Sequence, residues 1–310
     1  MSSEYRCTLE DLLIIDFETT CEENVFDHPV EIIQIGVVVL NIKDKVIQQQ
    51  SFKLQREDIV FDKLVKPVVN PILSQHCIEL TGIQQNDVDK AETFSVVYQH
   101  FLAWLKEHKF DERKFAFVCD GRQDMWRLAQ YQFLLIKENF PAIFRQWINM
   151  NKIFQDVAKE KYLSIAGRSN LQKMSNFFEI EFEGHAHNAI DDVKFLAKVT
   201  KKILDTGRFV NVNETLNCIS GWRNVPENVD PNWKSDMHKT HKVIARVLPL
   251  ASVKRRRAYD PAEDYGICLF CKKSTIDTCV GGVHKQYPAD LYSQIKEPFD
   301  FATVAGLKRE

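Results

Sequence analysis

Short apolar runs and stretches with helical spacing alternate over the first two thirds of this 310-residue chain. Three apolar runs predict strands: residues 11–17, residues 31–40, which are rich in β-branched side chains, and residues 114–120. Residues 46–55 are the candidate hairpin partner of the second strand. Strands that alternate with helices favour an α/β domain.

Four stretches carry apolar side chains at the spacing of one helix face. The predicted helices cover residues 93–107, a segment beginning near Asp124, residues 169–178 and a segment beginning near 189, and Ser169 is the candidate N-cap of the third. The polar stretch 205–214 ends the last helix. We therefore predict an α/β domain over residues 10–205 and a small, loop-rich module over residues 212–310.

Charge and cysteine content bound the class of protein. Residues 201–310 hold 18 basic and 13 acidic side chains, so this tail carries +5 and the first 200 residues carry −7. A basic tail on an acidic body suggests an anionic partner, although a solvated surface would look the same. The eight cysteines are spread too widely for a disulfide scaffold. With no signal peptide expected and apolar runs too short for a bilayer, we expect a cytoplasmic or nuclear protein and no membrane partner.

Acidic residues follow the predicted strands and begin the predicted helices. Asp16 and Glu18 lie two apart at the end of the first strand, and residues two apart on a strand point to the same face. Asp124 lies at a strand-to-helix junction, and His187 precedes Asp192 by five residues at the start of the last helix. Four carboxylates can hold two hard cations such as Mg²⁺ or Mn²⁺, and a nearby histidine can accept a proton from water.

Each of these residues also has an ordinary explanation when it is considered alone. An aspartate before a helix is commonly an N-cap, which would suffice for Asp124. Asp191 and Asp192 would complement the dipole of the last helix. His187 would be an ordinary loop histidine. The order and context of the five residues favour the metal site.

Five segments resemble successive blocks of one enzyme family. They are "IIDFETTCEE", "EIIQIGVVVL", "VKPVVNPILSQHCIELTGI", "CDGRQDM" and "HNAIDDVKFLAKV". Together with the order of the four carboxylates and the histidine, they resemble the DEDDh 3′–5′ exonucleases, in the branch of the histone-mRNA and RNAi-regulating exonucleases. The resemblance covers about residues 10–205. With its cysteine-rich tail, the whole chain resembles the cell-death-related nucleases of nematodes.

This resemblance implies an RNase H-like fold, with a mixed five-stranded sheet flanked by helices. It implies that Asp16, Glu18, Asp124 and Asp192 are metal ligands for two Mg²⁺ or Mn²⁺ ions, and that His187 is the general base. Two neighbours compete for these roles. Asp120 competes with Asp124, but only Asp124 occupies the position of the family's Asp-Met pair. His185 competes with His187, but only His187 has the five-residue separation from Asp192.

The resemblance also implies contacts with the terminal nucleotides of the substrate. The stretch containing Phe17, Thr19 and Thr20 would lie under the terminal nucleotide. "LTGI", which ends at Ile83, resembles a family loop whose apolar residue lies near the terminal bases. Ordinary packing is the alternative for all four side chains.

The tail contains a cysteine motif with the spacing C-x2-C-x7-C-x4-H. It comprises Cys268, Cys271, Cys279 and His284. Such a set suits one tetrahedral Zn²⁺, and four protein ligands leave no open position, so we expect a structural zinc site. Cys218, His238 and His241 are alternatives for the fourth ligand.

A basic run just upstream of this motif comprises Lys254, Arg255, Arg256 and Arg257. Such clusters contact phosphates without reading sequence, which favours binding to DNA or RNA. A solvated loop and a nuclear-localisation signal are the alternatives.

We therefore predict a metal-dependent 3′–5′ exonuclease that releases nucleoside 5′-monophosphates from DNA or RNA 3′ ends. The resemblance extends this to DNA degradation during apoptosis. We also expect the zinc module to help hold the substrate or to form a homodimer contact, and we consider other nucleases as partners. Two alternatives belong to other classes: a catalytically silent nucleic-acid-binding protein, and an interaction scaffold whose functional part is the zinc module.

Overall fold

The computed structural model describes residues 9–23, 30–42, 59–136, 138, 140–160, 170–208 and 210–215. Several sequence predictions lie outside these residues. They are the hairpin partner at 46–55, the N-cap Ser169, the basic run Lys254 to Arg257, and the zinc ligands Cys268, Cys271, Cys279 and His284 with their alternatives Cys218, His238 and His241.

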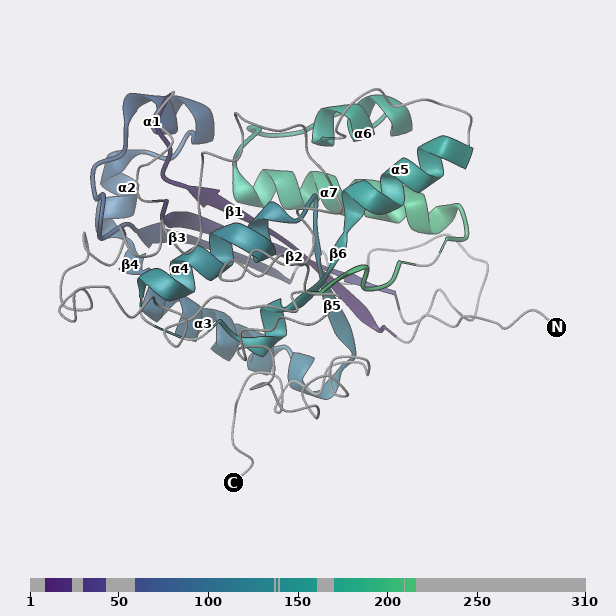
Figure 1. Ribbon diagram of the computed structural model, residues 1–310, viewed down its shortest axis with the longest axis horizontal. Helices are drawn as coiled ribbons and strands as arrows, with labels where there is room; N and C mark the ends of the chain where they lie inside the picture. The colour runs from purple at the N-terminus through teal and green to yellow at the C-terminus, as the bar shows by residue number, and fades with distance from the viewer. Residues whose placement is uncertain are drawn as a thin grey trace, which may run out of the picture.

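One mixed sheet forms the centre of the domain (Figure 1). Its strands lie in the order β4-β3-β2-β1-β5-β6-β7. β1 pairs antiparallel with β2 and parallel with β5. The strands are β1 (Asp11–Thr19), β2 (Ile32–Asn41), β3 (Val60–Lys66), β4 (Glu92–Thr93), β5 (Phe115–Cys119), β6 (Gln146–Asn149) and β7 (Glu214–Thr215).

The mixed α/β sheet is confirmed, with two more strands than the family resemblance implies. β4 and β7, the additional strands, are two residues long and lie at the two edges. Two residues are too few to show the period-two alternation by which a strand is predicted. The described antiparallel partners of β2 are β1 and β3.

Helices cover both faces of the sheet (Figure 1). The predictions for 93–107, for a helix from Asp124 and for a helix from 189 are confirmed by α3, by a π-helical segment that continues into α4, and by α7. The predicted helix at 169–178 is α6. Its N-cap is Asn170 and not Ser169, because the Asn170 side chain accepts a hydrogen bond from the Lys173 N–H at 3.0 Å. The helical elements are α1 (Gln75–Thr81), α2 (Gln85–Lys90), α3 (Phe94–Glu107), a 3₁₀ turn (Phe110–Glu112), the π-helical segment (Asp124–Ala129), α4 (Gln130–Leu135), a second 3₁₀ turn (Ala142–Phe144), α5 (Met150–Glu160), α6 (Leu171–Phe178) and α7 (Ala189–Asp205).

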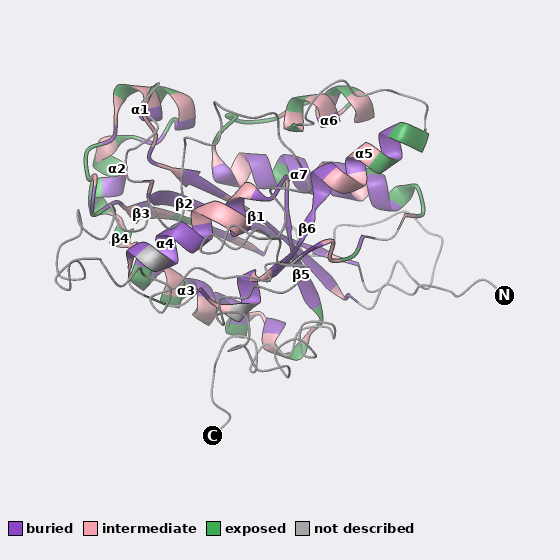
Figure 2. Cartoon of the chain, in the orientation of Figure 1, coloured by how far each residue is buried: buried purple, intermediate pink, exposed green. Residues whose placement is uncertain are grey.

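The central strands are buried on both sides (Figure 2). Leu13 and Ile15 of β1 pack into an aromatic-rich core with α3 and the π-helical segment. Leu12 and Ile14 point the other way and pack with α5, α6 and α7. This double coverage explains why β1 and β2 are continuous apolar runs in the sequence.

The same alternation places the β1 carboxylates. Asp16 and Glu18 continue the face of Leu12 and Ile14, which is the face that α7 covers. In the antiparallel register, Asp16 lies opposite Gly36 of β2 and Glu18 lies opposite Gln34.

Gly36 allows the start of α7 to approach this face. A Cβ atom at Gly36 would lie 2.6 Å from the carbonyl carbon of Ala189, closer than real Cβ contacts. Glycine is thus the residue that lets the first turn of α7 lie directly against β2, next to the β1 carboxylates.

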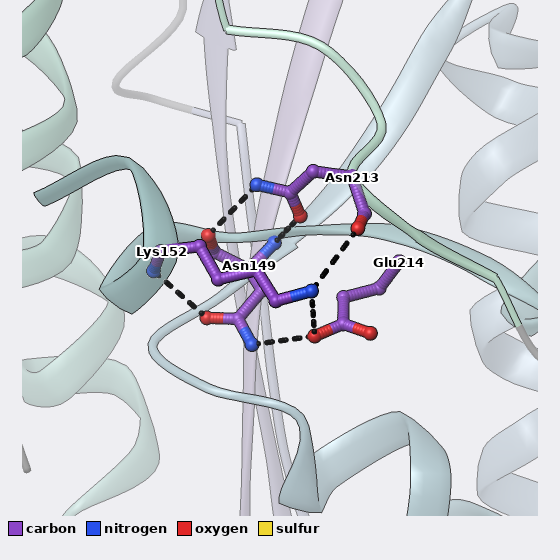
Figure 3. Close-up of polar contacts among 4 residues, drawn as sticks. All are labelled: Asn149, Lys152, Asn213 and Glu214. Carbon is purple, nitrogen blue, oxygen red and sulfur yellow. Dashed lines mark hydrogen bonds and ion pairs between the residues drawn. The ribbon is translucent and has the colours of Figure 1, made fainter. Parts of the chain in front are cut away.

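β7 is attached to β6 through a polar network (Figure 3). The side-chain amide of Asn213 makes both bonds with the backbone of Asn149: its Oδ1 atom accepts from the Asn149 N–H at 2.7 Å, and its Nδ2 atom donates to the Asn149 carbonyl at 3.1 Å. The buried Glu214 carboxylate accepts from Asn149 Nδ2 at 2.9 Å and pairs with Lys152 Nζ at 3.1 Å. The sheet therefore includes residues 214–215, which the sequence prediction placed in the C-terminal module.

No helix in the described parts of the chain is both long and apolar enough to cross a membrane.

Candidate active site

The first two site residues lie at the end of β1. Glu18 is buried and Asp16 is half-buried. The pairing with β2 shifts register between Glu18 and Thr19, so the strand becomes irregular immediately after the two carboxylates. The parallel pairing with β5 is already complete at Ile14, which leaves the last residues of β1 open on that side.

Asp124 fills the open side of β1. It begins the π-helical segment that follows β5, and it is buried. Its carboxylate accepts a hydrogen bond from the backbone N–H of Phe17, between the two β1 carboxylates. Single π-helical turns are rare and frequently occur at functional sites.

The loop before α7 supplies the remaining two residues. Asp192 lies in the first turn of α7 and is buried, whereas His187 is exposed on the loop. The backbone N–H of His187 donates to the Asp192 carboxylate. Ligand atoms of Glu18, His187 and Asp192 all lie within 4.8 Å of one another.

Burial and mutual repulsion raise the pKa values of the four carboxyl groups. Burial is the main cause in each case, and neighbouring carboxylates add to it. The pKa of Glu18 rises to about 9, with Asp192 and Asp124 as its main charged neighbours. The pKa values of Asp124 and Asp192 rise to about 7. That of Asp16 rises well above its ordinary value.

A metal cation is the natural counter-charge for this cluster. Within the described residues, no lysine or arginine forms an ion pair with any of the four carboxylates. Clustered carboxylate oxygens are the ligands that hard divalent cations prefer. The site is therefore suited to hold a divalent metal ion.

The structure distinguishes His187 from its competitor His185, but it leaves both Asp124 and its competitor Asp120 near the cluster. The ring of His185 lies beside Gly82, and His187 is the histidine that approaches Glu18 and Asp192. Asp120 contributes to the raised pKa values of Asp16, Asp124 and Asp192, so it lies next to the cluster.

Three of the four residues expected near the nucleotide have their side chains in the protein interior. Phe17 belongs to the aromatic-rich core, and Ile83 packs with a small apolar cluster around α1. The hydroxyl of Thr20 accepts from the Glu31 N–H at 3.0 Å. Thr19 is half-buried. Their contacts with substrate stay a prediction.

Gln34 is a buried polar residue beside the site that sequence reasoning did not select. It lies opposite Glu18, and its side-chain oxygen accepts a hydrogen bond from the Ala189 N–H at the start of α7. The signal was present in "EIIQIGVVVL", where one amide interrupts an otherwise apolar strand. A buried polar side chain needs hydrogen-bond partners, and these were not visible in the sequence.

Comparison with known proteins agrees with this geometry. The exonuclease family model (RNase_T) matches residues 13–200. The 3′–5′ exonuclease crn-4 of Caenorhabditis elegans is 40% identical over 301 residues, which is 97% of this chain and 98% of the relative. The human 3′–5′ exoribonuclease 1 is 32% identical over 209 residues, which is 67% of this chain but only 56% of the relative.

Two solved structures extend the likeness to three dimensions. The crystal structure of cell-death related nuclease 4 (CRN-4) has a TM-score of 0.64 at 38% identity, covering 97% of this chain and 98% of that one. The nuclease domain of 3′hExo, described as a DEDDh family member bound to rAMP, has a TM-score of 0.59 at 30% identity, covering 69% of this chain and 100% of that one. The chain belongs to the DEDDh family of 3′–5′ exonucleases, which act on nucleic acids.

Proposed function

We propose that this exonuclease removes nucleoside 5′-monophosphates one at a time from 3′ ends, using two divalent metal ions and His187 as general base. The observation that carries the proposal is the convergence of four carboxylates from three separate segments. Asp16 and Glu18 come from β1, Asp124 from the π-helical segment and Asp192 from α7.

These four residues fit a pair of Mg²⁺ or Mn²⁺ ions. Their oxygens are hard ligands, and their raised pKa values reflect first the cost of burying them as anions and then their mutual repulsion. DEDDh membership itself implies divalent metal ions. When bound, such a pair activates the attacking water and neutralises the charge that develops on the leaving 3′ oxygen.

His187 would accept the proton that leaves the attacking water. Its imidazole is exposed, so it can meet substrate and exchange its proton with solvent. It also lies within 4.8 Å of ligand atoms of Glu18 and Asp192, which places it at the edge of the cluster. A histidine in this position has the right chemistry for a general base near neutral pH.

The experiment is His187→Ala, with His185→Ala as the matched control from the same loop. Removing the base should lower the single-turnover rate on a 5′-labelled strand by about 10²- to 10⁴-fold. Binding of Mn²⁺ and of the strand should remain. His185→Ala should keep a near-normal rate. A His187→Ala enzyme that works at the normal rate would exclude this residue as the base.

Both DNA and RNA are proposed as substrates. The 3′hExo nuclease domain was solved with rAMP, which supports cleavage of RNA ends. The likeness to a cell-death related nuclease over 97% of this chain supports a role in DNA degradation during apoptosis. Digestion of matched DNA and RNA strands, single and duplex, tests the preference.

The C-terminal module would assist this activity. We propose that it holds one structural Zn²⁺ through Cys268, Cys271, Cys279 and His284, and that the nearby basic run Lys254 to Arg257 contacts substrate phosphates. It would also be the natural place for a contact with a second copy of the chain or with another nuclease.

A further inference from the structure

Gln34 makes three hydrogen bonds through one buried amide. Its Oε1 atom accepts from the Ala189 N–H at 3.0 Å. Its Nε2 atom donates to Asp62 Oδ1 at 2.9 Å and to Asn188 Oδ1 at 3.4 Å. Because a carboxylate only accepts, Asp62 fixes the orientation of the amide, so the oxygen of Gln34 must face the start of α7.

Two of these bonds go to Asn188 and Ala189, the residues that directly follow His187. α7 begins at Ala189, and the side chain of its N-cap residue, Asn188, makes no capping hydrogen bond. One of the orphan N–H groups of the first turn is therefore satisfied from the neighbouring strand, by Gln34. The start of α7 is thus tied to the sheet instead of capping itself.

The loop needs such an external tie. His187 has a φ angle of 63°, which lies in the left-handed region that costs free energy for residues other than glycine. Its side chain is exposed, so packing does not hold it. Strained conformations persist only where surrounding structure fixes them. Gln34 supplies part of that restraint from directly opposite Glu18 in the sheet.

We propose that Gln34 is a positioning residue for the reaction, which holds the His187 imidazole in place through Asn188 and Ala189. This inference rests on the proposed role of His187 as general base. The hydrogen bonds of the Gln34 amide go to Asp62, Asn188 and Ala189, so its proposed effect on the reaction is indirect. Its removal should therefore lower kcat more than it changes KM, because a general base acts on the chemical step.

The first experiment compares Gln34→Leu with a matched control, Gln132→Leu. The Gln132 side chain is also buried, and its Oε1 atom accepts from the Ile32 N–H of the same strand at 2.8 Å. Each variant removes a hydrogen bond between a glutamine side chain and a backbone N–H, and in each bond one of the two partners belongs to β2. Gln34→Leu should lower kcat by about 10- to 100-fold with KM within about 3-fold of normal. Gln132→Leu should lower only the unfolding temperature. Equal kcat values in the two variants would overturn the proposal.

A double-mutant cycle with His187→Ala separates positioning from a general structural effect. If Gln34 acts through His187, Gln34→Leu should cost less than about 2-fold in kcat once His187 is already alanine. If the kcat losses of Gln34→Leu and His187→Ala multiply in full in the double variant, the positioning role of Gln34 is overturned, and the role of His187 as base still stands. A His187→Ala enzyme of normal activity would instead remove the proposed function, which is a distinguishable result.

A reciprocal exchange provides a rescue test. Gln34→Glu places a second carboxylate against that of Asp62, and the repulsion between the two should lower kcat. Adding Asp62→Asn supplies a donor to that carboxylate, whose other oxygen can still accept from the Ala189 N–H. The double variant should recover at least 5-fold in kcat over Gln34→Glu, whereas Asp62→Asn alone should stay near normal. A double variant as slow as Gln34→Glu would overturn the proposal.

Discussion

Replacement of Gly36 by alanine tests whether the active site depends on the close approach of α7 to the sheet. The added Cβ atom would lie 2.6 Å from the carbonyl carbon of Ala189, 2.7 Å from its oxygen and 2.8 Å from the nitrogen of Ile190. All three atoms are backbone, so no side chain can rotate away. Since carbon atoms prefer separations of about 3.5–4.0 Å, the start of α7 must move by roughly 1 Å.

Such a movement would affect activity and stability differently. It carries Asp192 and the loop of His187 away from the β1 carboxylates, and a displacement of about 1 Å can cost on the order of 10²-fold in rate. Inserting a methyl group into a well-packed interior costs about 1–3 kcal/mol in the free energy of unfolding. We therefore expect kcat to fall about 100-fold in a protein that remains folded.

The assay is the single-turnover rate on a 5′-labelled strand at saturating Mn²⁺, with thermal unfolding measured in parallel. Gly207→Ala is the control, because Gly207 has φ 84 and an added Cβ there would meet nothing within 4 Å. That variant should lose stability through backbone strain and keep its kcat. A Gly36→Ala enzyme with normal kcat and an unchanged unfolding temperature would refute the steric argument.

Three further predictions concern metal and the C-terminal module. In the zinc-loaded chain without Mg²⁺ or Mn²⁺, the unfolding free energy should fall as pH rises from about 4 toward 9, because the folded-state pKa values of Glu18, Asp124 and Asp192 are raised and the folded state binds more protons than the unfolded one. Mg²⁺ should reverse this loss, with its largest effect at high pH, and a pH-independent unfolding curve would contradict the electrostatic account. Cys271→Ser should release zinc, measured by atomic absorption, and leave short strands cut at the normal rate; full zinc content would remove this residue from the ligand set. Neutral residues at Lys254 to Arg257 should weaken binding of long strands and flatten its salt dependence, because fewer counterions are released; an unchanged salt slope would favour a solvated loop or a targeting signal.

The sequence predicted the central strands, the main helices and the acidic pair at the end of β1, because these depend on local periodicity. Leu12, Ile14, Asp16 and Glu18 share one face of β1 by the period of two alone. Two-residue edge strands such as β7 have no periodicity to detect. β7 forms because residues 213–215 meet Asn149 and Lys152 across the sheet edge.

Long-range pairing decided what the sequence could not predict. Gln34 and Gly36 were visible as two interruptions of an apolar strand. That they lie opposite Glu18 and Asp16 follows from the register of β1 with β2. The start of α7 lies against them through the hydrogen bond between Gln34 and Ala189, two residues that are more than 150 positions apart in the chain. The π-helical turn at Asp124 likewise has no local sequence signature, since its apolar spacing resembles that of an ordinary helix.

The central claim is that the carboxylate cluster holds two divalent ions for hydrolysis, and calorimetric titration with Mn²⁺ tests it most directly. The titration is done on the zinc-loaded chain with a nucleoside 5′-monophosphate present, beside the Asp16→Asn variant. The account predicts two Mn²⁺ ions bound per chain in the native protein. It predicts at most one ion, bound more weakly, in Asp16→Asn, together with loss of mononucleotide release. Equal Mn²⁺ stoichiometry and affinity in the two proteins would contradict it.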